Sequence, residues 1–291
     1  MSLKTDILNV FRRIVQLPVA EKILLEKIKN GSTLSKKIIA GHNLYPKNTI
    51  RICTRNGIKY SLDISDYMEH AIYFNICDTV DFDRRFLYSI IQPDFICFDI
   101  GANIGETTLN FAKIAINGKI YSFEPVPFLF DRLKTNFTLN SFKNIELFNL
   151  ALSDKVEELY FENPSNSNSA GISMNKEFTP TATLVHSTTI DAFVTKNNIT
   201  KIDFIKIDVE GFENYVINGA KNTLLQHKPL LMIEIDNRYL KTKNTSEKII
   251  LTLLSSEFGY TLYRIDGINK IKISDIEDTD MHYDVFCVYE K

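Results

Sequence analysis

The sequence predicts an α/β fold with a mostly parallel, Rossmann-like sheet, and three observations support that prediction. Apolar runs of strand length alternate with stretches of helical periodicity from about residue 94 onward. A glycine-bordered loop, Gly101–Gly105, separates the first of these strands from the first of these helices. The 291 residues, 44% of them hydrophobic, suffice for one large core with an additional lobe.

The stretch between Asp94 and Glu124 predicts a strand, a glycine loop, a helix and a second strand. Its parts are the apolar run Phe95–Ile100, the loop, a helical face with Leu109, Ala112 and Ile116, the helix-ending Gly118, and the apolar run Lys119–Phe123. Glu124 follows the second strand, where a carboxylate can accept two hydrogen bonds from a ribose diol. The unit is therefore typical of a nucleoside-binding site.

The loop favours S-adenosylmethionine over a dinucleotide. It lacks the middle glycine of the G-x-G-x-x-G fingerprint, so it is less suited to binding a pyrophosphate. Asp99 precedes the loop and Glu106 opens the helix, so an anionic phosphate would be repelled and a ligand with an ammonium group would be attracted. The alternative is a plain βαβ unit whose glycines serve only the turn.

The chain after Glu124 continues the alternation of helices and strands. The expected elements are a helix over Phe128–Leu139, a strand over Ile145–Leu150, a helix beginning at Ile190 and Asp191, a strand over Phe204–Asp208, a helix over Phe212–Leu225 and a strand over Leu230–Asp236. A last helix over Ile249–Phe258 precedes two closing strands, Tyr260–Ile265 and Val285–Tyr289, with Asp266-Gly267 turning from the first of them into an acidic loop. This order is typical of a Rossmann-like domain.

Acidic side chains gather at the ends of two later strands. Asp208 ends one strand, Glu210 follows it, and Glu234 lies near the end of the next. Because adjacent parallel strands lie about 4.8 Å apart, these three carboxylates are expected to converge. Carboxylates this close raise one another's pKa, so Glu210 or Asp208 is a candidate proton acceptor.

Two other roles for these acids stay open. They could hold a divalent cation that lowers the pKa of an acceptor hydroxyl, although a metal-free base is favoured. Asp208 or Glu213 could instead cap the helix that begins near Gly211.

Four segments resemble the successive motifs of the FkbM-type S-adenosylmethionine-dependent methyltransferases, in the same order and spacing. They are Asp99–Gly105, Phe123–Pro125, Asn149–Asp154 and Ile205–Glu213. The resemblance extends over about two thirds of the chain, from roughly residue 56 to residue 235. It implies a class I methyltransferase fold: a mostly parallel, seven-stranded sheet with an antiparallel C-terminal hairpin, preceded here by an N-terminal helical lobe.

The resemblance also assigns roles to residues. The implied cofactor-binding residues are Asp99, Gly101, Ala102, Asn103, Gly105, Glu124, Ala151, Ser153 and Asp208, with Ala151 and Ser153 at the adenine edge. The positions of the strand ends, in contrast, give Asp208, Glu210 and Glu234 as the expected catalytic residues, with no metal ligand assigned.

The implied reaction is transfer of a methyl group to a hydroxyl, with a sugar of a capsular, lipopolysaccharide or secondary-metabolite glycan as the expected acceptor. A non-sugar natural product or a nitrogen acceptor is the alternative within the same class. From other classes, an NAD-dependent oxidoreductase is disfavoured because the loop lacks the middle glycine of the dinucleotide fingerprint. A non-catalytic nucleoside-binding module would bind the cofactor without methyl transfer.

The first part of the chain predicts a lobe of its own. We expect a helical extension over residues 1–48, a hairpin and helical lead-in over 49–93, and the cofactor-binding domain over 94–291. Helical patterns over residues 7–15 and 19–28 lie in a segment, residues 1–40, with eight basic and three acidic side chains. These helices could contact an anionic membrane surface, or pack on the core or on a second copy in a homodimer.

Three other segments could contact the acceptor. Asp63, Asp66 and Glu69 are interleaved with Tyr67, Tyr73 and Phe74, a mixture that suits a sugar but also an ordinary helix surface over core aromatics. The polar tract Asn163–Gly171 reads as a loop, and His186 is expected in a loop before Ser187.

Composition limits the location and the partners. A net charge of −2 disfavours nucleic acid. The four cysteines form no C-x-x-C motif, so we expect reduced thiols in a cytoplasmic protein. Neither a signal peptide nor an apolar run of the roughly 18–20 residues that a membrane helix needs is recognisable.

Overall fold

The computed structural model describes residues 12, 15–76, 80–162, 174–175, 180, 182–277, 279 and 282–290. The described residues group into two compact units, one up to residue 76 and one from residue 80 onward. The predicted division into three parts stays a prediction. The first predicted helix, over residues 7–15, and the polar tract Asn163–Gly171 lie largely or wholly outside the described residues.

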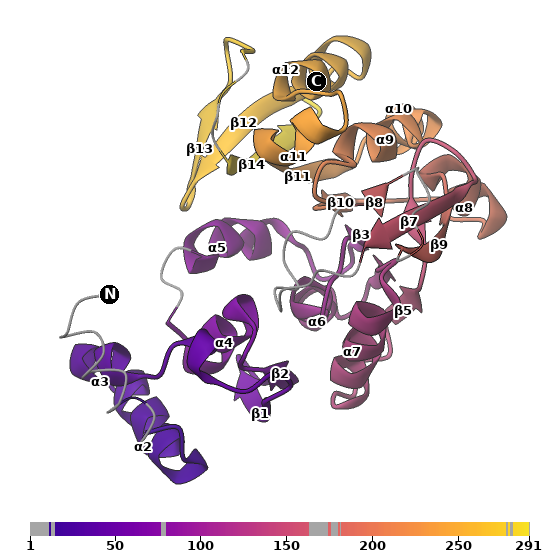
Figure 1. Cartoon of the computed structure of the whole chain (residues 1–291). Coiled ribbons are helices and arrows are strands. Elements are labelled where there is room, and N and C mark those ends of the chain that lie inside the picture. The colour runs from indigo at the N-terminus through magenta and orange to yellow at the C-terminus, as the bar shows by residue number, and fades with distance from the viewer. Residues whose placement is uncertain are drawn as a thin grey trace. The chain divides into compact units, whose positions relative to one another are not determined.

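The first unit combines short helices with one β-hairpin (Figure 1). Its elements are α2 (Pro18–Lys29), α3 (Thr33–Ile38), η1 (His42–Leu44), β1 (Ile50–Arg55), β2 (Ile58–Asp63) and α4 (Tyr67–Phe74). The hairpin predicted within residues 49–93 is confirmed: Arg55 pairs with Ile58 across a two-residue loop, Asn56 and Gly57. Both loop residues have positive φ, 49° and 76°, as a type I′ turn requires.

The acidic and aromatic stretch of the first unit is mostly buried, so its acids do not form the helix surface that the alternative expected, whereas two of its aromatic residues do lie in the core. Asp66 accepts hydrogen bonds from the amides that begin α4, and Glu69 accepts the Asp63 amide at 2.7 Å. Tyr73 and Phe74 are core residues, whereas Tyr67 is exposed. These acids hold the backbone of their own unit.

The second unit is built on an eight-stranded sheet with the order β13-β12-β14-β11-β10-β3-β4-β5. The strands are β3 (Ile96–Ile100), β4 (Lys119–Phe123), β5 (Ile145–Phe148), β10 (Phe204–Ile207), β11 (Leu230–Asp236), β12 (Thr261–Asp266), β13 (Asn269–Lys272) and β14 (His282–Val288). The pairs from β5 to β11 are parallel, and β14 is antiparallel to both β11 and β12. The predicted α/β fold and antiparallel closing pair are confirmed.

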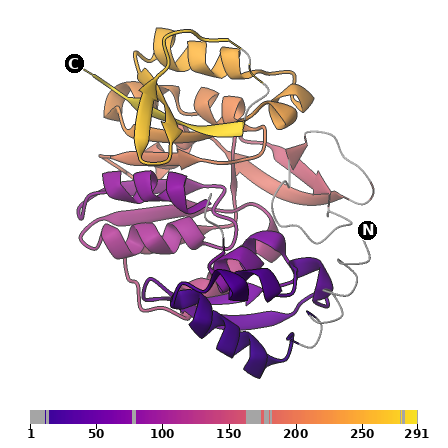
Figure 2. The ribbon, with the colours of Figure 1, turned by 90° about the vertical axis from the view of Figure 1, so that its left-hand side faces the viewer.

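The predicted count of seven strands is wrong by one. Asp266 and Gly267 do not lead into an irregular loop; they turn the chain into β13, which pairs with β12 from Asp266 opposite Asn269 to Tyr263 opposite Lys272. β13 is the edge strand at the yellow end of the sheet, with β5 at the opposite edge (Figure 1). Figure 2 views the protein from the side of this yellow edge.

Strands that follow β5 in the chain form a small second sheet. Its order is β6-β9-β7-β8, with β6 (Ala151–Leu152), β7 (Glu158–Glu162), β8 (Met174–Asn175) and β9 (Ala182–Thr188). His186 therefore lies within β9, opposite Glu158, and the prediction that it sits in a loop is wrong.

The helices of the second unit are α5 (Val80–Ile90), α6 (Glu106–Ile114), α7 (Pro127–Thr138), α8 (Ile190–Lys196), α9 (Glu213–Asn218), α10 (Lys221–His227), α11 (Asn237–Thr242) and α12 (Glu247–Thr252), which continues into the π-helical turn η2 (Leu253–Glu257). The single helix predicted over Phe212–Leu225 is broken at Gly219. A Cβ at Gly219 would lie 2.0 Å from the carbonyl oxygen of Ser153, so only glycine permits this approach. The pattern also missed α11, and α6 ends before Ile116, which is exposed.

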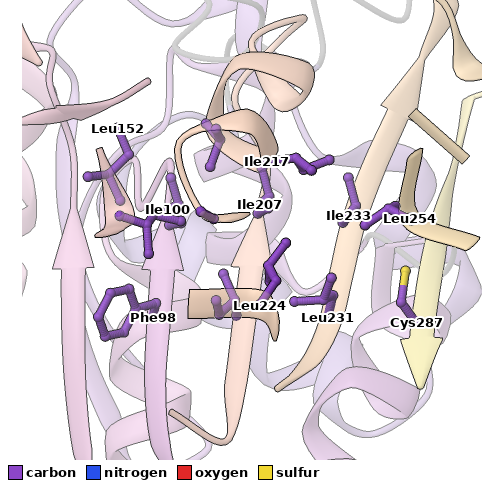
Figure 3. Packing of buried hydrophobic residues seen from close by; sticks show 14 of the residues in the cluster. Phe98, Ile100, Leu152, Ile207, Ile217, Leu224, Leu231, Ile233, Leu254 and Cys287 are labelled. Atoms are coloured by element: carbon purple, nitrogen blue, oxygen red, sulfur yellow. The ribbon is translucent and has the colours of Figure 1, made fainter. Parts of the chain in front are cut away.

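The main core lies between the sheet and the helices α8, α9, α10 and α12. Figure 3 shows Phe98 and Ile100 of β3, Ile207 of β10 and Ile233 of β11 under the helical residues Ile217 and Leu224. Aromatic contacts hold helices to strands elsewhere in the unit: Phe86 of α5 packs on Phe286 and Phe111 of α6 packs on Phe204, with ring centroids 5.1 and 5.5 Å apart. These contacts attach α5 to β14 and α6 to the start of β10.

Candidate active site

The glycine loop after β3 turns tightly against the protein's own backbone. Gly101, Asn103 and Gly105 have φ of 82°, 50° and 89°. A Cβ at Gly101 would lie 1.8 Å from the carbonyl oxygen of Asp208, and one at Gly105 would lie 2.4 Å from Leu133 Cδ1. Both glycines are thus required by internal packing, whatever the loop binds.

Four amides of this loop are already used within the protein. Gly101 and Ala102 donate to the carbonyl of Phe123 at 3.0 Å, Gly105 donates to the carbonyl of Ala102, and Asn103 donates to Glu124 Oε2 at 2.8 Å. A phosphate cradle needs amides that point at the ligand. Their internal use therefore supports the prediction that the loop does not bind a pyrophosphate.

Asp99 lies beneath the loop at the end of β3 and is fully buried. Its Oδ2 accepts a hydrogen bond from Thr108 Oγ1 at 2.5 Å, and that hydroxyl lies 2.8 Å from Ser122 Oγ. Asp99 Oδ1 has no hydrogen-bond partner within the described part of the chain, and Lys206 Nζ lies 4.0 Å from it. Burial raises the pKa of Asp99 above its ordinary value, although Lys206 opposes this.

Glu124 is also buried and ties the two strand ends together. Its Oε1 accepts the amide of Val126 at 2.9 Å, while Oε2 accepts the amide of Asn103. Burial raises the pKa of Glu124 to about 7 even though both amides favour the charged form. Each oxygen keeps a second lone pair, so the predicted contact with a ribose diol remains chemically available.

Ala151 and Ser153 lie in and just after β6 and are buried. The amide of Ser153 donates to the carbonyl of Thr188 at 2.9 Å, and its hydroxyl donates to Asp154. Their predicted role at the adenine edge stays a prediction.

The structure brings together the three predicted catalytic acids. Carboxylate oxygens of Asp208, Glu210 and Glu234 all lie within 4.8 Å of one another. Glu210 has φ of 50°, and the next residue, Gly211, has φ of 97°. A Cβ at Gly211 would lie 2.9 Å from the carbonyl oxygen of Tyr239, so this turn after β10 is held against α11.

Lys206 distinguishes the members of this cluster. Its Nζ donates to Asp208 Oδ2 at 2.7 Å. Burial raises the pKa of Asp208, but the Lys206 ammonium and a hydrogen bond with Glu234 together lower it, and the net pKa lies below the ordinary value. Burial and the charge of Asp208 both raise the pKa of Glu234 well above its ordinary value. Asp208 therefore loses its proton before Glu234 does.

Sequence reasoning gave no role to three contacts around this cluster. The first is the contact of Lys206 with Asp208. Its signal was the spacing, because a lysine two residues before an acid on the same strand points to the same face of the sheet. His282 Nε2 lies 2.7 Å from Glu234 Oε1, a contact set by the β11–β14 register that no local pattern reveals. Arg84 Nη1 pairs with Glu106 Oε2 at 3.1 Å, so the negative charge at the start of α6 is partly balanced.

A family model described as the methyltransferase FkbM domain matches residues 99–262, more than half of the chain. The chain belongs to this family. The match starts at Asp99 and includes the glycine loop, Glu124 and all three clustered acids. The predicted enzyme class, an S-adenosylmethionine-dependent methyltransferase with the class I fold, is thereby confirmed.

Two curated proteins and one solved structure illustrate the similarity. The 2-O-methyltransferase NoeI of Sinorhizobium fredii is 26% identical over 193 residues, covering 60% of this chain and 76% of NoeI. The hexuronic acid methyltransferase AglP of Haloferax volcanii is 29% identical over 151 residues, covering 52% of this chain and 60% of AglP. The crystal structure of methyltransferase FkbM from Methylobacillus flagellatus has 18% identity and a TM-score of 0.42, covering 76% of this chain and 55% of that one.

The residues around the loop suit the cofactor of this family. S-adenosylmethionine is cationic, and the loop is bordered by buried carboxyls with one orphaned oxygen, Asp99 Oδ1. The loop amides are bonded internally, as a ligand without phosphate permits. Asp99, Glu124 and the loop between them are therefore the residues that would hold it.

Glu213 provides a stability test at this FkbM-family site. Its Oε1 accepts the Gly211 amide at 3.0 Å, so this acid holds the turn that precedes α9 and does not cap the helix. Its Oε2 is buried with no hydrogen-bond partner in the described part of the chain. Burial raises the pKa of Glu213 to about 7 from an ordinary 4.5. The unfolded chain then loses this proton at lower pH than the folded chain, so the contribution is fully present below about pH 4.5 and lost as pH rises through about 7.

Replacing Glu213 with Gln should remove this loss. The free energy of unfolding of Glu213→Gln relative to wild type should increase between about pH 5 and about pH 8, by roughly 1–3 kcal/mol. Urea unfolding of both proteins at the two pH values measures this difference in free energy. Titratable groups that both proteins share contribute little to it, because their effects largely cancel. A difference that stays constant with pH would show that Glu213 does not titrate as its burial requires.

Proposed function

We propose that this protein methylates a hydroxyl oxygen of a sugar, with S-adenosylmethionine as the methyl donor. The observation that carries the proposal is the acid cluster at the ends of β10 and β11, in which the pKa of Asp208 lies below that of Glu234 and the Asp208 carbonyl packs against the glycine loop. The names of NoeI and AglP, a 2-O-methyltransferase and a hexuronic acid methyltransferase, support oxygen and sugar as the acceptor class. A capsular, lipopolysaccharide or secondary-metabolite glycan is the narrower form of the proposal.

Asp208 is proposed as the proton acceptor. When bound, S-adenosylmethionine supplies an electrophilic methyl group, so the protein has to orient the acceptor hydroxyl and take up its proton. Lys206 keeps Asp208 ionised, and the proton passes from the hydroxyl to the Asp208 carboxylate. A weak base suffices, because an oxygen that gains a methyl group becomes strongly acidic. Glu210 and Glu234, whose carboxylate oxygens lie within 4.8 Å of that of Asp208, are proposed to orient the hydroxyl.

The charge already present disfavours the divalent-cation alternative. The Lys206 ammonium donates to Asp208 and would repel a second cation in the same cluster. We therefore expect methyl transfer to continue at an unchanged rate after treatment with EDTA. A rate that falls on chelation and returns with Mg²⁺ or Mn²⁺ would instead make the three acids a cation site.

The cytoplasmic location is also part of the proposal. Cys53, Cys97 and Cys287 are free thiols, and the last two are buried. Reduced thiols suit a reducing compartment.

Two measurements test the function. Isothermal titration calorimetry with S-adenosylhomocysteine and with NAD should show binding of the first and none of the second. Incubation with S-adenosylmethionine carrying a labelled methyl group, against a panel of neutral sugars, uronic acids and non-sugar alcohols, should transfer label to a sugar. Tight NAD binding would favour an oxidoreductase, and cofactor binding with no transfer to any acceptor would favour a binding module.

A further inference from the structure

The outward side of α2 in the first unit carries apolar side chains that its own core does not use. Leu24 and Ile28 point inward and are buried. Val19 and Ile23, one turn apart on the opposite side, are 73% and 53% exposed. Leu17 before the helix and Leu34 on α3 are also mostly exposed. A helix that needs only one apolar side for folding thus has a second one facing solvent.

Lysines flank this side of the helix. At 100° per residue, Lys22 and Lys27 lie on either side of the line through Val19 and Ile23, and both are exposed. Of the two acids in α2, Glu26 shares the outward side, whereas Glu21 is buried and accepts a hydrogen bond from Arg51 Nε at 2.8 Å. We call Val19, Lys22, Ile23, Glu26 and Lys27 the outer face of α2.

We propose that the outer face of α2 docks on a membrane surface that contains anionic lipids. Apolar side chains between lysines match the boundary between headgroups and acyl chains, where the apolar groups enter and the ammonium groups meet lipid phosphates. Residues 1–40 hold eight basic and three acidic side chains in a chain of net charge −2, so the attraction is local to this segment. A second copy fits less well, because a two-fold contact would oppose two basic faces.

The contact would be peripheral. In the part of the chain that the structure describes, no helix is both long enough and apolar enough to cross a membrane. Because two residues enter the interface, we expect reversible binding that depends on lipid charge and on ionic strength.

Vesicle flotation of the full-length protein tests the proposal. Wild type should bind vesicles in which roughly a third of the lipid is phosphatidylglycerol, and should bind pure phosphatidylcholine vesicles weakly. The double variant Val19→Gln, Ile23→Gln should bind the anionic vesicles about tenfold less tightly. Lys22→Gln and Lys27→Gln should each weaken binding by about fivefold at low salt.

A matched control is Ile249→Gln, which replaces an isoleucine of α12 in the second unit that is 49% exposed. This variant should bind vesicles as wild type does. Circular dichroism and S-adenosylhomocysteine binding, both independent of the lipid readout, would confirm that the variants fold. Equal flotation of the double variant and wild type, or no binding of wild type to anionic vesicles, would overturn the proposal. A concentration-dependent dimer that the double variant abolishes would replace the lipid by a second copy.

Discussion

Replacing Asp208 with Asn should lower the kcat of methyl transfer about a thousandfold while changing the affinity for S-adenosylhomocysteine by less than about threefold. Asn has the same shape as Asp and still accepts a hydrogen bond from Lys206 Nζ, which lies 2.7 Å from Asp208 Oδ2. It cannot take up a proton. The loss should therefore appear in the chemical step, and a single-turnover assay together with calorimetry measures the two effects separately.

Glu210→Gln is the matched comparison for Asp208→Asn, because Glu210 lies in the same cluster and was an equal candidate in the sequence. If Asp208 is the base, Glu210→Gln should have the smaller effect on kcat. A variant Asp208→Asn that keeps more than about a tenth of wild-type kcat, alongside an inactive Glu210→Gln, would transfer the role to Glu210. Loss of cofactor affinity in Asp208→Asn would mean that Asp208 acts chiefly in binding.

Local patterns predicted the elements that bear the site, because short buried strands need apolar runs that end at turns. β4 and β11 match their predicted bounds, Lys119–Phe123 and Leu230–Asp236, residue for residue. Parallel pairing of β10 with β11 then placed Asp208 and Glu234 together near the carboxyl ends of these two strands, as the spacing of adjacent strands required.

What the sequence could not predict depends on contacts between distant segments. The break between α9 and α10 follows from the approach of Gly219 to the backbone of Ser153, some sixty positions earlier in the chain. His282 meets Glu234 only because of the antiparallel register of β14 on β11. Periodicity carries no information on either contact, since both are decided by packing after the elements form.

The same limit affects how the glycine loop was interpreted. The sequence placed this loop in a nucleoside-binding site, yet the space that Gly101 leaves open is filled by the carbonyl of Asp208. Glu124, which accepts the amide of Asn103, shows in the same way that this acid also holds the loop in shape. Sequence patterns located the residues but could not separate binding from support.

Gly101→Ala should therefore destabilise the second unit by about 4 kcal/mol or more and abolish binding of S-adenosylhomocysteine. The left-handed backbone at φ of 82° accounts for about 1–2 kcal/mol of this. The remainder comes from a Cβ placed 1.8 Å from the carbonyl oxygen of Asp208, a backbone atom that cannot move aside alone, because the Asp208 amide donates to the carbonyl of Ile100 at 3.1 Å.

Gly259→Ala separates the two contributions within the same unit. Gly259 has φ of 73°, and the nearest atom to its added Cβ is Tyr289 Cε2 at 3.4 Å, an ordinary contact with a side chain. Its free energy of unfolding in urea should fall by only about 1–2 kcal/mol, with cofactor binding unchanged. Equal losses in the two variants would mean that β3 and β10 are not pressed together at Gly101. A larger loss in Gly101→Ala would show that the contact placing Asp208 beside the loop also holds the sheet together there.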